Sequence, residues 1–209
     1  MRVVLLVLVL IPYELFGGLT FENYTKKIEL TEDIPSEDFT FCYKNTGKYP
    51  VKIIATRTSC GCTILTDIKR NISPGESGEV NGKFVSNGVV GEQERDIYIQ
   101  TDDVSNEEIK LNLKINITSN VIITPKILVW DKDKLSTKTL KILLSEKVTH
   151  ISNFECKDKG FLYTLKKISK GELMLSITPT DAQKKRTLLT FTAEFTNLKK
   201  DYNIFLLIK

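Results

Sequence analysis

Histidine is almost absent from this sequence, because His150 is the only one among its 209 residues. Most serine and cysteine nucleophiles work with a histidine base, and many zinc sites use histidine ligands. Hydrolase chemistry is therefore not expected in the chain before His150, and we predict no catalytic residues. Val148 and Thr149 precede His150 in a strand-like run, so our interpretation makes it an ordinary strand residue.

Ligands for a soft metal are scarce as well. Met174 is the only methionine after the first residue, and the chain has four cysteines. A closed zinc site takes four ligands, so a dedicated zinc site is not expected. Two thiolates close together, as at Cys60 and Cys62, suit Cu(I). Cu(I) is the single cofactor that the composition leaves open.

A large excess of one charge is also missing, since 30 basic and 26 acidic residues leave a formal net charge of +4. Short basic clusters occur at Lys166-Lys167, Lys184-Lys185-Arg186 and Lys199-Lys200. Proteins that bind nucleic acid usually gather such residues into a stripe. These clusters are better explained as solvated strand ends and turns, and nucleic acid is not an expected partner.

Long apolar runs are missing except at the N-terminus. There Met1-Arg2 precede the apolar run Val3–Ile11, and Glu14 and Gly17-Gly18 follow it. A charged start, an apolar centre and small residues are typical of a secretory signal. The run is far shorter than the about 20 residues that span a membrane. We predict a cleaved signal peptide over residues 1–18, a mature chain without an integral membrane segment, and a periplasmic or secreted location where disulfides persist.

Alternation of apolar and polar residues fills most of the remaining chain. It is clearest over residues 109–117, where every second residue is isoleucine or leucine, and it recurs over residues 39–43. A period of two predicts half-buried strands. Turn residues separate them, as at Pro74 and Gly75, where proline presets φ and glycine accepts a positive φ. No segment has a long helical period, so the sequence predicts an all-β protein.

The alternating pattern restarts near Asn120. We therefore predict two tandem immunoglobulin-like β-sandwich domains, over residues 19–119 and 120–209, because short strands with regular turns are typical of sandwiches. The second domain begins with one predicted strand over Val121–Trp130. Pro125 lies inside it, which suits an edge strand.

The motif Cys60-Gly61-Cys62 carries the most information about chemistry. In an extended strand the two side chains would point the same way, with Cα atoms roughly 6.5–7 Å apart, at the outer limit for a disulfide. Closing the bond needs a local bend, which Gly61 is able to supply. The resulting ring would be small, strained and easily reduced. Arg57 and Lys69 are the nearest cations in the sequence and are candidates to stabilise a thiolate.

The other cysteines leave the disulfide pairing open. Straight strands would hold Cys42 far from Cys60, whereas a bridge from Cys42 to Cys156 stays open. The Cys60/Cys62 pair itself has three interpretations, which are redox exchange, soft-metal binding and a purely structural turn. Ser59 and Thr63 on either side of the motif are predicted to be turn formers.

The first domain also combines several short motifs: Phe41, Asn45-Thr46-Gly47, Pro50-Val51, Ser59-Cys60-Gly61-Cys62-Thr63, Pro74-Gly75-Glu76, Gly78, Phe84 and Gly91. This combination resembles the bacterial family known as domain of unknown function fifteen-seventy-three, over about Phe39 to Asp103. The resemblance implies an immunoglobulin-like sandwich related to the hydin and major-sperm-protein group. It also implies an exported envelope domain, often in tandem, and no known activity.

Together these observations favour an exported, non-catalytic binding or scaffold module whose partner is another envelope protein. Its expected binding surfaces are the sheet edges and the loops at one end of the first domain. The alternative is a thiol–disulfide exchange or Cu(I)-handling protein that uses Cys60 and Cys62.

Overall fold

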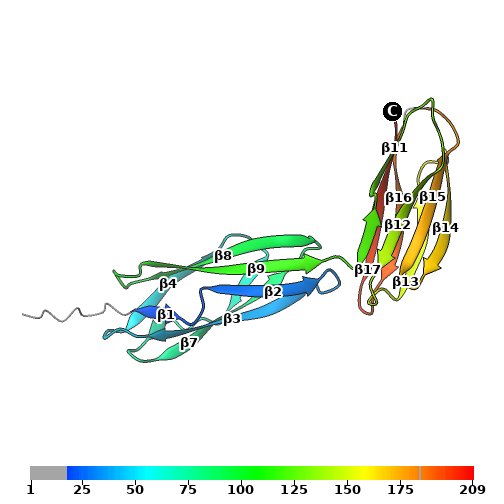
Figure 1. The fold of residues 1–209 in the computed structure, drawn as a ribbon. Helices are drawn as coiled ribbons and strands as arrows, with labels where there is room; N and C mark the ends of the chain where they lie inside the picture. Colours follow the sequence, from blue (N-terminus) through cyan, green and yellow to red (C-terminus); the bar gives the residue numbers. More distant parts are fainter. Residues whose placement is uncertain (1–17, 184) are drawn as a thin grey trace, which may run out of the picture. The chain divides into compact units, whose positions relative to one another are not determined.

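The structure is a computed structural model that describes residues 18–183 and 185–209. The predicted signal peptide therefore lies outside the described residues apart from Gly18. Every regular element of the described chain is a β-strand (Figure 1), which confirms the all-β class. The fold divides into two compact units. Unit 1 holds Ser36–Asn87, Glu92–Asn116 and the residues up to Ile28, and unit 2 holds Glu29–Pro35, Gly88–Gly91 and Ile117–Lys209.

Two sheets form the first sandwich. One has the strand order β1-β3-β7-β5 and the other the order β2-β9-β8-β4-β6. The strands of the first sheet are β1 (Leu19–Phe21), β3 (Ser36–Asn45), β7 (Ser77–Val85) and β5 (Thr63–Thr66). Those of the second are β2 (Thr25–Thr31), β9 (Glu108–Thr118), β8 (Gly91–Thr101), β4 (Val51–Thr58) and β6 (Asn71–Ile72).

The core of the first sandwich follows the alternation of the sequence. On β3, Phe39, Phe41 and Tyr43 are buried, and Cys42 between them is half-buried. On β9 the predicted apolar positions are buried as well: Ile109, Leu111, Leu113, Ile115 and Ile117. Burying one face of each strand in this way is the main driving force for stacking two sheets.

Two glycines of β7 accommodate the aromatic rings of β3. Tyr43 is the cross-strand partner of Gly78, and Phe39 is the partner of Gly82. A Cβ at Gly78 would lie 2.5 Å from Tyr43 Oη, and one at Gly82 would lie 2.4 Å from Phe39 Cζ. The rings thus lie over the glycines, and this close packing holds β3 against β7. Burial and the charge of Glu76 raise the pKa of the enclosed Tyr43 hydroxyl.

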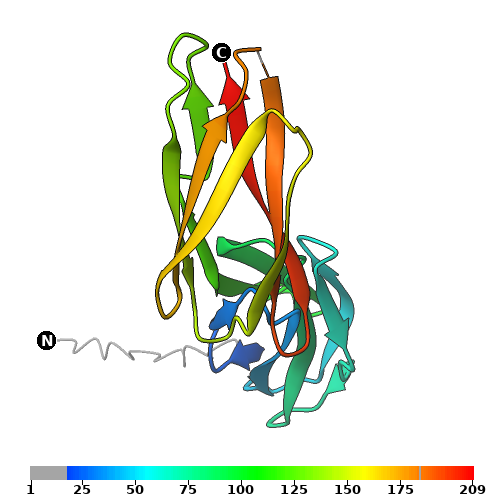
Figure 2. The same ribbon diagram turned by 90° about the vertical axis from the view of Figure 1, so that its right-hand side faces the viewer.

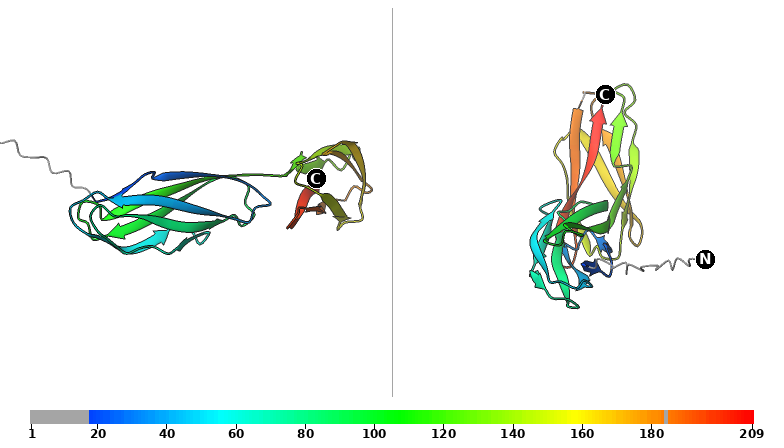
Figure 3. Two further views of the ribbon diagram at one scale, coloured as in Figure 1. Left: turned by 90° about the horizontal axis from the view of Figure 1, so that it is seen from below. Right: turned by 90° about the vertical axis from the view of Figure 1, so that its left-hand side faces the viewer.

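The second sandwich is built in the same way. Its sheets have the strand orders β10-β12-β15-β14 and β11-β17-β16-β13. The strands of the first sheet are β10 (Val121–Thr124), β12 (Lys138–Leu144), β15 (Glu172–Pro179) and β14 (Phe161–Ser169). Those of the second are β11 (Ile127–Trp130), β17 (Lys199–Ile208), β16 (Lys185–Glu194) and β13 (His150–Cys156). Figure 2 shows these strands from a second side, and the left view of Figure 3 looks almost along them.

Trp130 lies at the centre of the second core. It is fully buried, its ring lies 5.7 Å from that of Phe161, and its indole N–H donates to the Ser136 carbonyl at 2.7 Å. A buried indole needs such a partner because an unpaired donor is costly. Since Trp130 is the single tryptophan of the chain, its fluorescence reports on this sandwich alone.

The prediction of a single strand over Val121–Trp130 was wrong. The segment breaks at the cis peptide bond Thr124–Pro125 and forms two strands in different sheets. β10 pairs antiparallel with β12, while β11 pairs parallel with β17. Both short strands are edge strands, so the inference from Pro125 that this segment lies at a sheet edge holds.

Candidate functional site

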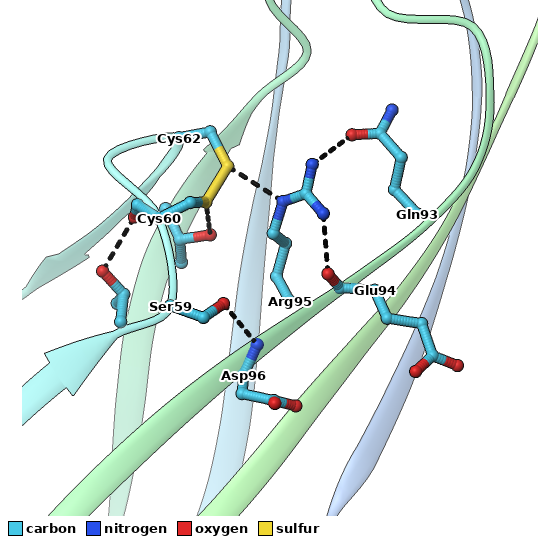
Figure 4. The surroundings of a disulfide bond; sticks show 9 residues. Ser59, Cys60, Cys62, Gln93, Glu94, Arg95 and Asp96 are labelled. Atoms are coloured by element: carbon cyan, nitrogen blue, oxygen red, sulfur yellow. Dashed lines mark hydrogen bonds between the residues drawn. A yellow bond between two sulfur atoms is a disulfide. The ribbon is translucent and has the colours of Figure 1, made fainter.

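Cys60 and Cys62 form a disulfide in the turn between β4 and β5 (Figure 4). Their Cα atoms lie 5.3 Å apart, which is closer than the roughly 6.5–7 Å of an extended strand. The chain therefore makes the local bend that the sequence required. Cys42 and Cys156 are free thiols, so no bridge joins these two cysteines.

Hydrogen bonds to two neighbouring strands fix this turn. The Ser59 N–H donates to the Asp96 carbonyl of β8 at 2.9 Å, and the Asp96 N–H donates back to Ser59 Oγ at 3.0 Å. On the other side of the turn, the Val85 N–H of β7 donates to the Cys62 carbonyl at 2.8 Å. The turn is thus held between the two sheets of the first sandwich, and the disulfide does not have to supply that connection.

Gly61 has no conformational need to be glycine. Its φ is not among the positive values of this chain, and a Cβ built on it would meet nothing within 4 Å. Gly75 differs, with a φ of 77° in the turn that the Glu76 N–H closes by donating to the Ser73 carbonyl at 3.0 Å. The turn at Pro74-Gly75 thus has the geometry that the sequence indicates. The bend at Gly61 comes instead from the hydrogen bonds around it.

The two sulfur atoms of the disulfide have different surroundings. Arg95 Nε donates to Cys62 Sγ at 3.1 Å, whereas Cys60 Sγ has the Thr63 hydroxyl at 3.8 Å. Both cysteines are partly exposed, and the Gly61 between them is exposed. A cation beside one sulfur stabilises negative charge on that sulfur. If the bond opens, Cys62 is therefore the better thiolate of the two.

The guanidinium group of Arg95 is itself held in place. One of its terminal nitrogens donates to the Glu94 carbonyl at 2.7 Å, and the other donates to Gln93 Oε1. Nε is left to point at Cys62 (Figure 4). Because both terminal nitrogens also have acceptors, the cation is held in place and does not have to reorganise when charge develops on the sulfur.

The cation at the disulfide is not one of the two named from the sequence. Arg57 stacks over the ring of Tyr98 at 3.6 Å and pairs with Glu108. Lys69 pairs with Glu76. Closeness along the chain therefore misidentified the charged partner of the disulfide.

A signal for Arg95 is nevertheless present in the sequence. Arg95 is in phase with Ile97 and Ile99 of β8, which are fully buried. A charged residue in phase with a buried face has to find a partner at the end of the sandwich, since an unpaired buried charge is costly. Its partners are the groups of the Cys60–Cys62 turn and of its own strand.

The other candidate ligands lie in unit 2. His150 is exposed at the start of β13, and Met174 is 39% exposed on β15. Among residues 18–183 and 185–209, no group of three or more His, Cys, Asp or Glu side chains is placed to hold a metal ion. No helix in these residues is long and apolar enough to cross a membrane. The free Cys156 is half-buried, and burial raises the pKa of its thiol.

Comparison with solved structures gives several similar chains. A protein of unknown function from Porphyromonas gingivalis W83 is 9% identical, covers 91% of this chain and 100% of its own, and has a TM-score of 0.41. The ASH/PapD-like domain 7 of human CEP192 is 13% identical, covers 49% of this chain and 85% of its own, and has a TM-score of 0.37. The YadV chaperone is 10% identical, with coverage of 89% and 99% and a TM-score of 0.37.

The search of curated proteins found no match. The family described as "Protein of unknown function (DUF1573)" matches residues 19–117. This range contains the whole stretch of motifs around Cys60-Gly61-Cys62 and ends within β9. The family resemblance seen in the sequence is therefore confirmed, and the first sandwich of this chain matches the DUF1573 family over residues 19–117.

Proposed function

We propose that the first sandwich is a thiol–disulfide exchange module of an exported protein, with Cys60–Cys62 as its exchanging bond. The single observation that carries the proposal is the contact of Arg95 Nε with Cys62 Sγ at 3.1 Å. This contact makes the two sulfurs chemically unequal, and an unequal, accessible pair is what directed exchange requires. The sequence had suggested this role as the alternative to a binding module.

The reaction starts when a thiolate of a partner dithiol attacks Cys60 Sγ. The Cys60–Cys62 bond breaks, a mixed disulfide forms at Cys60, and Cys62 leaves as a thiolate next to Arg95. The second thiolate of the partner then attacks the partner's first sulfur in the mixed disulfide, and Cys60 leaves as a thiolate. The partner gains one disulfide, and Cys60 and Cys62 become thiols after taking up two protons. In the reverse direction the reduced pair reduces a disulfide of the partner.

Export is part of this proposal and rests on the sequence of residues 1–18. In an oxidising compartment a surface disulfide persists between exchange events. Its ring contains Gly61 as the only intervening residue, so the bond closes almost no loop in the unfolded chain. Since a disulfide stabilises mainly by restricting the unfolded chain, this bond contributes little to stability. That favours an exchange role over a structural one.

The test is the reduction equilibrium of the disulfide. The exported chain is equilibrated in redox buffers, alkylated and mapped by mass spectrometry. We expect a midpoint between about −120 and −270 mV, the range of exchange proteins. A midpoint below about −300 mV, or unfolding on reduction, would mean a structural bond and overturn the proposal. Cys42→Ser and Cys156→Ser should leave the midpoint unchanged, because both thiols are free.

A binding role is a second candidate, favoured by the loops at one end of unit 1. Tyr49 before β4 is 80% exposed and Val104 after β8 is 87% exposed, and both line a cavity of about 540 Å³. Large apolar side chains that are this exposed mark interaction surfaces when they cluster. This end lies at the start of β4, whereas the disulfide follows its other end.

Replacing Tyr49 and Val104 by serine tests this surface. In cross-linking of whole cells, we expect the wild-type chain to give a specific adduct that the double variant loses, because the apolar contact is gone. Ile127→Ser is the control, since Ile127 is 56% exposed but lies on β11 of unit 2. An adduct that persists in the double variant would exclude these loops as the binding surface.

A further inference from the structure

The last strand of one sheet in unit 2 has a free edge. The strand order β10-β12-β15-β14 leaves β14 with β15 as its only hydrogen-bonded neighbour among the described residues. β14 covers Phe161–Ser169 and is 9 residues long. It lies at the margin of its sheet in Figure 1 and runs across the front of unit 2 in yellow in Figure 2. A free edge presents backbone N–H and C=O groups that another strand can bind.

The other edge strands are less suited to accept a strand. β1, β5, β6, β10 and β11 each have 4 residues or fewer. β13 is interrupted by an irregular register between Ser152 and Glu155, where Asn153 has a φ of 53°. β2 has 7 residues. Among the edge strands of the described residues β14 is the longest, and its register with β15 is regular from Phe161 to Lys167.

β14 also exposes apolar side chains that an isolated edge strand would avoid. Leu162 is 64% exposed, Leu165 is 40% exposed and Ile168 is 44% exposed. Leu162 pairs with Thr178 of β15 and Leu165 pairs with Leu175, so the two leucines project from opposite faces of the sheet. An added strand would cover apolar side chains on both faces at once.

The charge at this edge is of one sign. Lys166 and Lys167 lie on β14 and Lys170 lies in the following turn. None of the three forms a salt bridge within the described chain, in contrast to Lys141 of the same sheet, which pairs with Glu172 at 2.6 Å. Three unpaired cations beside a free backbone edge attract carboxylates.

The same lysines argue against a second copy of this chain as the occupant. Two β14 edges placed side by side would bring Lys166 and Lys167 of both copies together. Lysine on an edge strand is a common way to prevent such self-pairing, and like charges on adjacent strands are unfavourable. An acidic segment of a different protein gains from these charges.

We propose that β14 binds an extended segment of a partner protein that carries apolar and acidic side chains. The segment extends the sheet by one strand through backbone hydrogen bonds. Its apolar side chains cover Leu162 and Leu165, and its carboxylates pair with Lys166 and Lys167. This surface belongs to unit 2 and is independent of the disulfide of unit 1.

Two labelled peptides serve as probes with the whole mature chain. They are acetyl-Thr-Val-Val-Thr-Glu-Glu-Thr-amide, which places one valine and one glutamate on each face of an extended strand, and the same peptide with lysine in place of glutamate. Fluorescence anisotropy should give an affinity for the acidic peptide about three- to tenfold higher, since exposed ion pairs contribute little each and the basic peptide meets like charge at this edge. Hydrogen exchange should slow for backbone amides within Phe161–Ser169. Equal affinities, no binding of the acidic peptide, or protection on another strand would overturn the proposal.

Charge reversal separates the edge from the general charge of the molecule. Lys166→Glu with Lys167→Glu should reverse the preference, so that the basic peptide binds more tightly. Lys132→Glu with Lys134→Glu makes the same change in net charge at exposed positions between β11 and β12 and should preserve the preference for the acidic peptide. If both double variants lose binding of the acidic peptide to the same extent, the effect comes from net charge, and strand addition is refuted.

Self-association is measured on the same variants. Sedimentation of the wild-type chain should show no dimer that depends on β14, that is, no dimer that Leu165→Asp dissociates. If such a dimer forms, β14 pairs with a second copy, and the acidic partner is the wrong occupant.

Discussion

Gly82→Val is expected to lower the unfolding free energy of the first sandwich by about 3 kcal/mol, at the upper end of overpacking costs. Gly82 lies on β7 between Phe39 of β3 and Leu65 of β5. A Cβ at this position would lie 2.4 Å from Phe39 Cζ and 2.8 Å from the Ile64 carbonyl oxygen. Phe39 is 2% exposed and has no room to withdraw, and a backbone oxygen moves only if the strand moves.

The measurement is urea unfolding followed by two signals. Far-ultraviolet circular dichroism reports on both sandwiches, while the fluorescence of Trp130 reports on the second alone. Gly82→Val should shift only the unfolding transition of the first sandwich, which circular dichroism detects and the fluorescence of Trp130 does not. Gly61→Val is the matched control, because its Cβ meets nothing within 4 Å, and we expect a change within about 0.5 kcal/mol. Equal stability of the two variants would contradict the packing argument.

The same substitution connects packing with the proposed chemistry. β5 begins at Thr63, directly after Cys62, so a displaced β5 also moves the disulfide turn. In Gly82→Val we therefore expect the contact between Arg95 and Cys62 to loosen and the reduction midpoint to change. The rigidity of the site thus depends on a glycine that carries no functional group.

The sequence was most informative where a local pattern decides the structure. Alternation predicted the buried positions of β3 and β9, because successive side chains of a strand point to opposite faces of the sheet, one toward the core and one toward solvent. The bend at Cys60–Cys62 was predictable as a condition of the disulfide, since a fully extended chain holds the two Cα atoms at the outer limit for that bond. The family resemblance predicted an immunoglobulin-like sandwich for the first domain, and the family match over residues 19–117 confirms the resemblance.

Features that depend on distant residues were missed. β11 was merged with β10 because both are apolar, and nothing local indicates that Ile127–Trp130 pairs in parallel with β17, some 80 positions later in the chain (Ile127 with Phe205). Gly61 was assigned a conformational role that its backbone does not have, because the hydrogen bonds to Asp96 and Val85 come from other strands. The open edge of β14 was also invisible, since strand order is a property of the whole sheet.

Arg95→Glu is expected to slow reduction of the disulfide by small thiols about 100-fold, and Arg95→Gln about tenfold. A hydrogen bond to a charged group contributes about 1.5–3 kcal/mol, and each factor of ten in rate corresponds to about 1.4 kcal/mol. In the wild-type chain Arg95 Nε lies 3.1 Å from Cys62 Sγ, so the leaving thiolate forms next to a cation. A glutamate at this position would place a carboxylate there instead.

The rate is measured by stopped-flow reaction with dithiothreitol at several salt concentrations. The position of attack is measured separately, by trapping the glutathione adduct and mapping it. We expect the adduct on Cys60 in the wild-type chain and on both cysteines in Arg95→Gln, a redistribution that a loss of stability alone would not produce. Arg57→Gln removes the same charge at a side chain that stacks on Tyr98, and it should leave both results unchanged.

If Arg57→Gln slows the reaction as much as Arg95→Gln, the effect comes from the general field of the domain, and the contact with Cys62 has no special role. If only Arg95 matters and the adduct moves, the disulfide has a preferred direction of opening. A structural bond has no use for such a preference, because its two sulfurs never separate during its function. A directed opening at Cys60 therefore distinguishes exchange from stapling more sharply than the reduction midpoint does, since the midpoint averages over both sulfurs.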